Sequence, residues 1–281
     1  MVKHLPPAVK QLLTLRNPNA YPSPSLSKLY GVFQSTYAVA KQRHAETGWL
    51  VLATCSLLTT NVPSSVGHLY RFATRSNPDD AASRTSVSDA VNKAALMREA
   101  ALKSTIFVGV PRVILSFAGL SEAAEDDVKA KLRTESRRHA NADNIESIMS
   151  RGQGLWDSIY AQHAVKLYNK LGAYHPDFIS FIIQSYGAVL SPLPGADEQG
   201  NLSRAMGSVV GVACLRAEER VVPQLTSHVF GLLGAHELPN LTEEDKWLSS
   251  EEGTEWVIRT VDALVDVVRP ERHSQEVKAK L

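Results

Sequence analysis

Apolar residues recur every three or four positions along most of the chain, a spacing typical of helices that bury one face. In residues 25–44, for example, Leu26, Leu29 and Phe33 fall on one side of a helix. The Val- and Ile-rich alternating runs that strands require, with turn signals between them, are not found in the sequence. The pattern therefore predicts an all-α protein, a helical bundle.

Two stretches, residues 48–60 and 202–215, are apolar on nearly every side. Such a pattern is typical of helices that are buried all round, so these two are predicted to lie at the centre of the bundle. Amphipathic helices are expected to surround them. They are predicted at residues 25–44, 63–73, 88–107, 112–120, 155–171, 177–190, 222–233 and 254–268, with a kink at Gly109-Val110-Pro111.

One short phrase occurs twice. Residues 62–68 read VPSSVGH and residues 222–228 read VPQLTSH, so each has Val-Pro, four residues and then His. An apolar stretch that carries one of the two cysteines, Cys55 or Cys214, precedes each phrase. The simplest explanation is an internal duplication, which predicts two copies of one helical hairpin packed about a pseudo-twofold axis.

The duplication predicts how the chain is divided. A highly charged stretch separates the two halves and is predicted to be a solvated helix plus linker, with its Arg137-Arg138-His139 cluster on the solvated surface. The expected parts are an N-terminal segment (1–24), a first helical unit (25–121), a charged connector (122–142), a second helical unit (143–268) and a flexible tail (269–281).

Charge and hydropathy exclude several protein classes. The 30 Lys and Arg residues nearly balance the 29 Asp and Glu residues, which argues against a nucleic-acid-binding protein with its concentrated basic face. No apolar run reaches the roughly 18 residues of a membrane-spanning helix, so no membrane insertion is expected. Two cysteines provide no disulfide framework and indicate a reducing compartment.

The last three residues are Ala279, Lys280 and Leu281. They are similar to the C-terminal peroxisomal signal, whose best-known form is Ser-Lys-Leu. Ala279 keeps the small first residue, Lys280 supplies the cation, and Leu281 carries the apolar side chain. The tripeptide therefore predicts recognition by the peroxisomal import receptor and residence in the peroxisome matrix. The alternative is a chance tripeptide on the end of a helix.

An apolar helix, a break and then a helix with His near its start resemble the core of alkylhydroperoxidase-D-like proteins, the superfamily that includes carboxymuconolactone decarboxylase. Residues 97–120 (MREAALKSTIFVGVPRVILSFAGL) and 155–178 (LWDSIYAQHAVKLYNKLGAYHPDF) are similar to further segments of that superfamily. Together with the C-terminal tripeptide, the chain is most similar to fungal peroxisomal matrix proteins built as two fused units of this type.

In the peroxidase branch of the superfamily, the resemblance implies two cysteines just before and within the start of the His-bearing helix. Those places are occupied by Asn61 and Ser64 in the first copy and by Val221 and Gln224 in the second. Because no thiol stands at any of them, we do not expect a disulfide-cycling peroxidase. The two cysteines present lie about a helix earlier and are expected to be buried structural thiols.

The decarboxylase branch implies a proton donor or acceptor and a cationic pocket for carboxylates. His68 is the candidate acid/base, Glu99 and Lys103 share a helix face, and Arg112 could clamp a carboxylate. Each has an alternative. His68 could be a core-edge histidine, Glu99 and Lys103 a surface pair worth about 0.2–0.5 kcal/mol, and Arg112 a helix cap or salt-bridge partner. His228 has the same two interpretations as His68, and the structural one is preferred.

The sequence contains no His-Glu-x-x-His, no paired Cys-x-x-Cys and no Gly-rich phosphate loop, so no metal or other cofactor is expected. Single bundles of this kind leave large apolar surfaces, which predicts a homodimer. Three functions are open. The first is an enzyme that acts on an unknown small molecule, decarboxylase-like or another acid/base lyase or isomerase. The second is a non-catalytic binding or structural matrix protein, and the third is a peroxisomal antioxidant.

Overall fold

The computed structural model describes residues 4–195 and 198–269. In these residues the regular elements are helices, and the one extended pairing is an isolated bridge between Arg75 and Arg84. The predicted all-α fold is confirmed. No helix in this part of the chain is long and apolar enough to cross a membrane.

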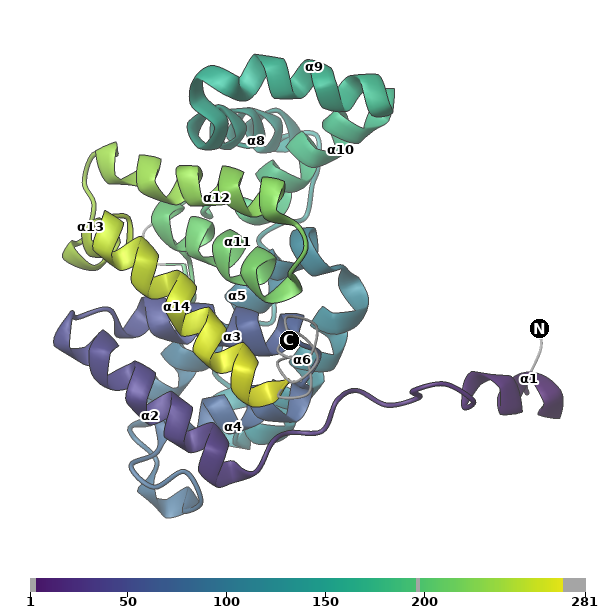
Figure 1. Cartoon of the computed structure of the whole chain (residues 1–281), viewed down its shortest axis with the longest axis vertical. Coiled ribbons are helices and arrows are strands. Elements are labelled where there is room, and N and C mark those ends of the chain that lie inside the picture. Colours follow the sequence, from purple (N-terminus) through teal and green to yellow (C-terminus); the bar gives the residue numbers. More distant parts are fainter. Residues whose placement is uncertain (1–3, 196–197, 270–281) are drawn as a thin grey trace, which may run out of the picture.

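The elements follow one another with short connections, and Figure 1 shows how they are arranged. In the first half they are α1 (Pro7–Leu13), α2 (Leu26–Gln42), α3 (Glu46–Thr59), α4 (Pro63–Thr74), η1 (Ala81–Ser83), α5 (Val87–Val108), α6 (Val110–Ala123) and α7 (Asp126–Lys129). In the second half they are α8 (Ile145–Tyr160), η2 (Ala161–His163), α9 (Ala164–Tyr174), α10 (Pro176–Ser185), the π-helical turn η3 (Tyr186–Leu190), α11 (Arg204–Glu218), α12 (Val222–Gly234), η4 (Ala235–Glu237), α13 (Glu243–Leu248) and α14 (Glu251–Val268).

The centre of the molecule is formed by α3 and α11, which pack against each other. Both helices are buried along nearly their whole length, as their all-round apolar sequences predict. α5 and α14 each pack against both of them (Figure 1). Burying a Leu or Val side chain contributes roughly 1.5–3 kcal/mol, so this contact between the halves is a main source of stability.

The two halves share one hydrophobic core. Trp49 and Leu52 from the first half lie in the same buried cluster as Val210 and Val261 from the second. A smaller core around Trp156 joins α8, α10 and η3, which lie beyond α12 at one end of the molecule (Figure 1). The second half therefore contributes both to the shared core and to this smaller layer.

Two predicted helix boundaries have different outcomes. Gly109 has φ = 82°, a conformation that favours glycine, and it separates α5 from α6 at the predicted kink. The continuous helix predicted over residues 155–171 is wrong, because the chain turns at Ala161, where φ is 44°. This turn brings the carbonyl of Ala164 within 3.3 Å of the Trp156 indole nitrogen, which donates a hydrogen bond to it.

The charged connector is less solvated than predicted. Its regular structure is the four-residue helix α7, in which Val128 is fully buried. The Arg138 side chain is only 13% exposed and forms an ion pair with Glu99, whereas Arg137 is half-exposed. The interpretation of this cluster as solvated surface is therefore wrong for Arg138, because the nearby buried carboxylate attracts its guanidinium.

Near the N-terminus, α1 has no buried residue and stands away from the body of the protein (Figure 1). The segment that follows returns to the body, where the Tyr21 amide donates to the Asn61 carbonyl over 3.1 Å. The predicted peroxisomal tripeptide, Ala279 to Leu281, lies outside the described residues.

Candidate functional site

The predicted pair Glu99 and Lys103 lies one turn apart on α5, with Nζ 3.4 Å from Oε1. Both side chains are buried, so the surface-pair interpretation is wrong. Arg138 forms a second ion pair with the same Glu99 carboxylate. The carboxylate therefore compensates two buried cations.

The Lys103 ammonium binds backbone carbonyls of a neighbouring element. Its ammonium donates to the carbonyls of Val189, Leu190 and Ser191 over 3.0, 2.6 and 3.0 Å. These carbonyls lie at the end of η3, where helix carbonyls lack partners within the helix and a cation is favoured. Burial lowers the Lys103 pKa to about 8, although Glu99 opposes the shift. Lys103 thus ties α5 to η3, and its three N–H groups are committed to these carbonyls.

The contacts of Arg112 fit the alternative interpretation, in which it caps a helix end or pairs with a carboxylate. Its Nη1 donates to the Thr59 carbonyl over 2.9 Å at the end of α3, and it also forms an ion pair with Glu218 at the end of α11. The first contact satisfies a carbonyl at the C-terminal end of α3, and the second pairs the guanidinium with a side-chain carboxylate. Arg112 already has a protein carboxylate as its partner, which does not favour the predicted role as a carboxylate clamp.

His68 lies on α4 in a different environment. Its ring meets the edge of Tyr30 at a centroid distance of 6.2 Å. Nδ1 is buried and has no hydrogen-bond partner among the described residues, and burial and Arg71 lower its pKa. No hydrogen bond, ion pair or ring contact joins His68 to Glu99, Lys103 or Arg112 in the described part of the chain. The structure therefore pairs Glu99 with Lys103 and leaves His68 and Arg112 apart from them.

The histidine of the second repeat, His228, is 5% exposed and lies on α12. Its ring meets the edge of Phe107 at 5.0 Å and that of Tyr160 at 6.3 Å. Nδ1 packs so closely on Gly211 of α11 that a Cβ at this position would approach it to 2.8 Å. Neither ring nitrogen forms a hydrogen bond with any residue that the structure describes.

His228 lines a small, largely enclosed cavity together with Arg204 and Ser208. The cavity volume that the centre of a water molecule can occupy is about 10 Å³. This is close to the roughly 10–15 Å³ that one water requires. Burial and the charge of Arg204 lower the His228 pKa to about 4. At neutral pH the ring is therefore uncharged, with one nitrogen able to accept a proton and the other to donate one.

Arg204 is a cation without a protein counter-charge. Its guanidinium donates to Ser208, to the Ser158 hydroxyl over 3.2 Å and to the Gly231 carbonyl over 3.2 Å, all neutral groups. Burial lowers its pKa to about 10, and no carboxylate in the described residues pairs with it. Arg204 is also the first residue of α11, whose own first turn holds no acidic residue, and the nearest carboxylate at this helix end, Asp245, accepts a hydrogen bond from the N-cap Ser203 rather than from Arg204. The arrangement therefore favours an anion.

Two tyrosines complete the polar part of this region. The hydroxyls of Tyr160 and Tyr186 lie 3.1 Å apart and share a hydrogen bond. Burial raises the pKa of both, so both stay protonated at neutral pH. Tyr160 also packs against the His228 ring, so the smaller core around Trp156 forms one wall of the cavity.

Sequence reasoning missed Arg204 as a site residue. The available signal was a cation at the start of a helix that carries no further charge before Arg216, followed by the small residues Gly207, Ser208 and Gly211, which allow close approach by neighbouring groups. The repeat did identify His228, but the preferred candidate was its counterpart His68. The structure gives the second repeat the buried histidine and the cation.

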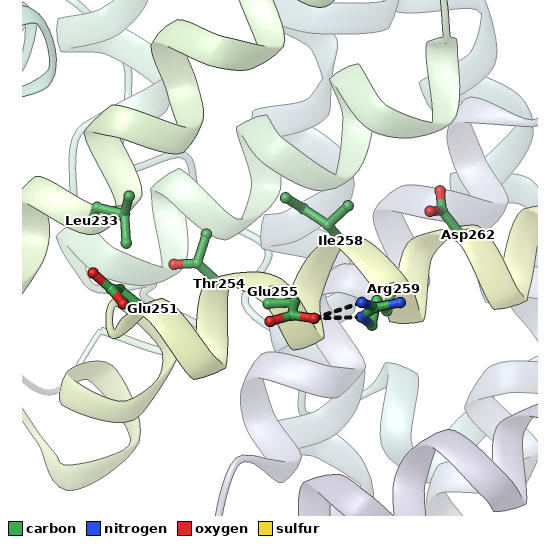
Figure 2. Close-up of a pocket in the computed structure, with 7 residues that line it drawn as sticks. All are labelled: Leu233, Glu251, Thr254, Glu255, Ile258, Arg259 and Asp262. Atoms are coloured by element: carbon green, nitrogen blue, oxygen red, sulfur yellow. Dashed lines mark hydrogen bonds and ion pairs between the residues drawn. The ribbon is translucent and has the colours of Figure 1, made fainter.

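A wider depression runs along α14, as Figure 2 shows. It is open to solvent, and three of its four charged side chains already have partners. Glu255 pairs with Arg259 at 2.7 Å (Figure 2), and Asp262 pairs with Arg216 at 2.6 Å. The fourth, Glu251, has no partner among the described residues, but it is exposed in the first turn of α14, so this surface lacks the partly buried, unpaired cation that distinguishes the His228 cavity.

No three His, Cys, Asp or Glu side chains in residues 4–195 and 198–269 converge in a way that could hold a metal ion. Comparison with known proteins gives no match to a family model, to a curated protein or to a solved structure. The resemblance to alkylhydroperoxidase-D-like proteins therefore stays a prediction from the sequence motifs.

Proposed function

We propose that the chain is a peroxisomal matrix protein of the alkylhydroperoxidase-D-like type that takes a small anionic molecule into the His228 cavity. One observation carries the proposal: a buried histidine without a hydrogen bond to any described residue and a partly buried arginine without a carboxylate partner line the same cavity. Buried polar and charged groups are normally paired, because leaving them unpaired is costly. A carboxylate would pair with both.

The geometry fits acid–base chemistry next to a carboxylate. Neutral His228 is the group that takes or returns a proton, because its lowered pKa leaves a nitrogen lone pair free at neutral pH. Arg204 stabilises negative charge on the bound oxygen, and the Ser208 hydroxyl is close enough to Arg204 to orient it. The reaction class is a lyase or isomerase step that requires no thiol.

Entry to the cavity requires movement of one wall. Leu155 and Ile159 of α8 close it on one side, and these residues belong to the smaller core rather than to the shared one. Because α8 packs on α12 from outside the central bundle, it can shift without opening the α3–α11 contact. We therefore place the entrance between α8 and α12.

The helix contacts support two related units. α3 and α11 each pack against the other and against both α5 and α14, while α4 adjoins α3 and α12 adjoins α11. Both His-bearing helices follow a residue with positive φ, Asn61 at 60° and Arg220 at 56°. This reciprocal arrangement is what a duplicated helical hairpin would produce, and it supports the proposed family.

The proposal includes the cellular location of the protein and its binding partners. The C-terminal tripeptide supports binding to the peroxisomal import receptor. Homodimerisation is supported by large apolar side chains on the outer face of α9 and α10, where Val165 is 73%, Tyr174 68% and Phe181 61% exposed. Light scattering after size exclusion tests the dimer, for which we expect twice the 30.7 kDa chain mass.

A panel of small carboxylates, from formate to C4 acids, tests the function by thermal shift and by calorimetric titration. At least one acid should stabilise the wild type in a saturable manner, while Arg204→Gln should lose at least tenfold in affinity. Arg259→Gln is the matched control, because it removes an exposed arginine that pairs with Glu255. No saturable binding to the wild type, or equal binding by Arg204→Gln, would overturn the proposal.

The size of the cavity favours a second candidate, a non-catalytic binding protein. With room for about one water molecule, the cavity as it stands leaves no space for a second reactant beside a bound small anion. Saturable carboxylate binding without proton exchange at the bound ligand would identify this function. Exchange of the ligand's α-hydrogens with deuterated solvent, lost in His228→Gln, would identify the enzyme.

A further inference from the structure

A groove lies between α5, α6 and the charged connector. Its volume is about 530 Å³, within the roughly 300–1,000 Å³ of pockets that bind small molecules. Its lining includes the apolar side chains of Phe117, Leu120 and Leu132 and the cations Arg98 and Arg133. A smaller hollow beside it is also lined by Arg98, Phe117 and Arg133, so the two arginines and the aromatic ring lie where the two spaces meet.

The two arginines have no carboxylate partner among the described residues. Arg98 donates through Nη1 and Nη2 to the Arg133 carbonyl, both over 3.3 Å, and Arg133 donates through Nη1 to the Glu135 carbonyl over 2.7 Å. Neutral carbonyls do not cancel the two charges, and these contacts occupy only part of the donor set of each guanidinium. Partial burial and the positive charge of Arg133 lower the Arg98 pKa, as expected of two cations that repel each other.

The other charged groups at the groove are already paired. Glu99, which lines the smaller hollow, binds Lys103 and Arg138 on its own carboxylate. Lys129, which lines the groove, pairs with Asp126 at 2.8 Å. The charge of the two arginines is therefore left for an anion that enters the groove.

An apolar track leads away from the arginines along α6. Val110, Ile114 and Phe117 are spaced by four and then three residues, which places them on one face of the helix. Val110 is 55% and Ile114 59% exposed, whereas Phe117 is half-buried. The helix rises roughly 10 Å between Val110 and Phe117. Exposed apolar side chains that continue a groove in this way favour an apolar ligand.

We propose that this groove binds an amphiphilic carboxylate with an unbranched alkyl tail, whose head pairs with Arg98 and Arg133 and whose tail lies along Phe117 and Ile114. A guanidinium forms paired, charge-assisted hydrogen bonds with a carboxylate, which supplies the missing counter-charge. The tail removes the apolar track from water. The groove shares no lining residue with the His228 cavity, so this site is separate from that of the proposed function.

Calorimetric titration of the full-length protein with decanoate, below its micelle concentration, tests the site. Decanoate should bind saturably, and binding should weaken as salt is added. Neither acetate, which has the head alone, nor decanol, which has the tail alone, should displace it at equal concentration. From hexanoate to decanoate, each added methylene should tighten binding by about twofold, because the open track covers only one side of the tail.

Two variants locate the head of the ligand. Arg98→Gln and Arg133→Gln should each lower the affinity for decanoate about tenfold, because each removes a charge-assisted contact. Arg137→Gln is the matched control, since Arg137 lies on the same connector but pairs with Glu198 at 3.2 Å and does not line the groove. Its affinity for decanoate should equal that of the wild type.

A further pair of variants locates the tail. Ile114→Ser should lower the affinity for decanoate about fivefold by removing an apolar contact from the track. Leu115→Ser is its control, because Leu115 is also exposed on α6 but points about 100° away from Ile114. Circular dichroism confirms that each variant keeps its helical fold.

Three results would overturn the proposal. The wild type could show no saturable binding of decanoate. Arg98→Gln, Arg133→Gln and Arg137→Gln could bind it equally well. Decanol could displace it at equal concentration, which would leave the arginines without a role.

The Arg204→Gln variant separates this site from the His228 cavity. It should bind decanoate as tightly as the wild type, because Arg204 does not line the groove. Loss of decanoate binding in Arg204→Gln, with Arg98→Gln unaffected, would place the amphiphile in the His228 cavity. That result would contradict the groove site and support the proposed function.

Discussion

Arg204 lies in the same cavity as His228, and its positive charge is one of the two causes that lower the pKa of that histidine to about 4. The other cause is burial, which comes first in size. The two side chains come from α11 and α12, the helices of the second repeated hairpin. Their juxtaposition depends on Gly211, because any side chain there would meet the His228 ring.

Removing the positive charge of Arg204 should change the pKa of His228 in a measurable direction. In Arg204→Gln the His228 pKa should rise above 4, because the repulsion between the two positive charges is gone. It should stay below 6.5, because the ring is still buried. NMR titration of the ring signals measures the shift, with Arg259→Gln as control. A His228 pKa equal to that of the wild type would contradict this electrostatic coupling.

Acid should destabilise the fold through His228. Its folded pKa lies below the ordinary value of about 6.5, so between pH 6.5 and pH 4 the unfolded chain binds more protons and stability falls as the pH falls. The shift corresponds to about 3 kcal/mol, fully present above pH 6.5. Urea unfolding of the wild type and of His228→Gln across this range isolates the contribution. If the free energy of unfolding depends on pH in the same way in both proteins, His228 does not contribute to the acid sensitivity.

Lys103 should prove essential for stability rather than for chemistry. Lys103→Met leaves three carbonyls at the end of η3 without their donor and weakens the compensation of the Glu99 charge. Losing one partner of a buried pair costs roughly 3–5 kcal/mol. Chemical unfolding measures this, and Lys93→Met, from a more exposed pair with Asp89 on the same helix, is the control. A loss no larger than the control's would show that Lys103 is not the structural tie that its contacts indicate.

The C-terminal tripeptide predicts the cellular address. A fluorescent protein fused to the N-terminus should appear in peroxisomes, and deletion of Ala279, Lys280 and Leu281 should release it to the cytosol while its melting temperature stays the same. Microscopy with a peroxisomal marker provides the measurement. A wild-type fusion found only in the cytosol would contradict the predicted signal.

The sequence predicted the features of the fold that depend on local pattern. The all-round apolar stretches gave the two central helices, and Gly109 gave the break between α5 and α6. The break at Ala161 had no such signal, since neither glycine nor proline stands there. It depends on packing around Trp156, which lies in the smaller core formed with α10 and η3.

The candidate site was harder to predict, because its properties arise from contacts between distant segments. The repeat identified His68 and His228 as related, but only packing shows that His228 is the one enclosed with a cation. Likewise, nothing local distinguishes Arg138 from Arg137, and only the structure brings one of them to Glu99. The buried thiols of Cys55 and Cys214 both reach the Ser104 hydroxyl, which depends on the crossing of α3 and α11.

The most direct test of the account is an NMR titration that follows the ring signals of the histidines while a small carboxylate is added. The account predicts saturable shifts of His228 that are lost in Arg204→Gln, with His68 unchanged. Saturable shifts at His68 alone, or no saturable shift at either ring, would contradict the assignment of the site to the second repeat.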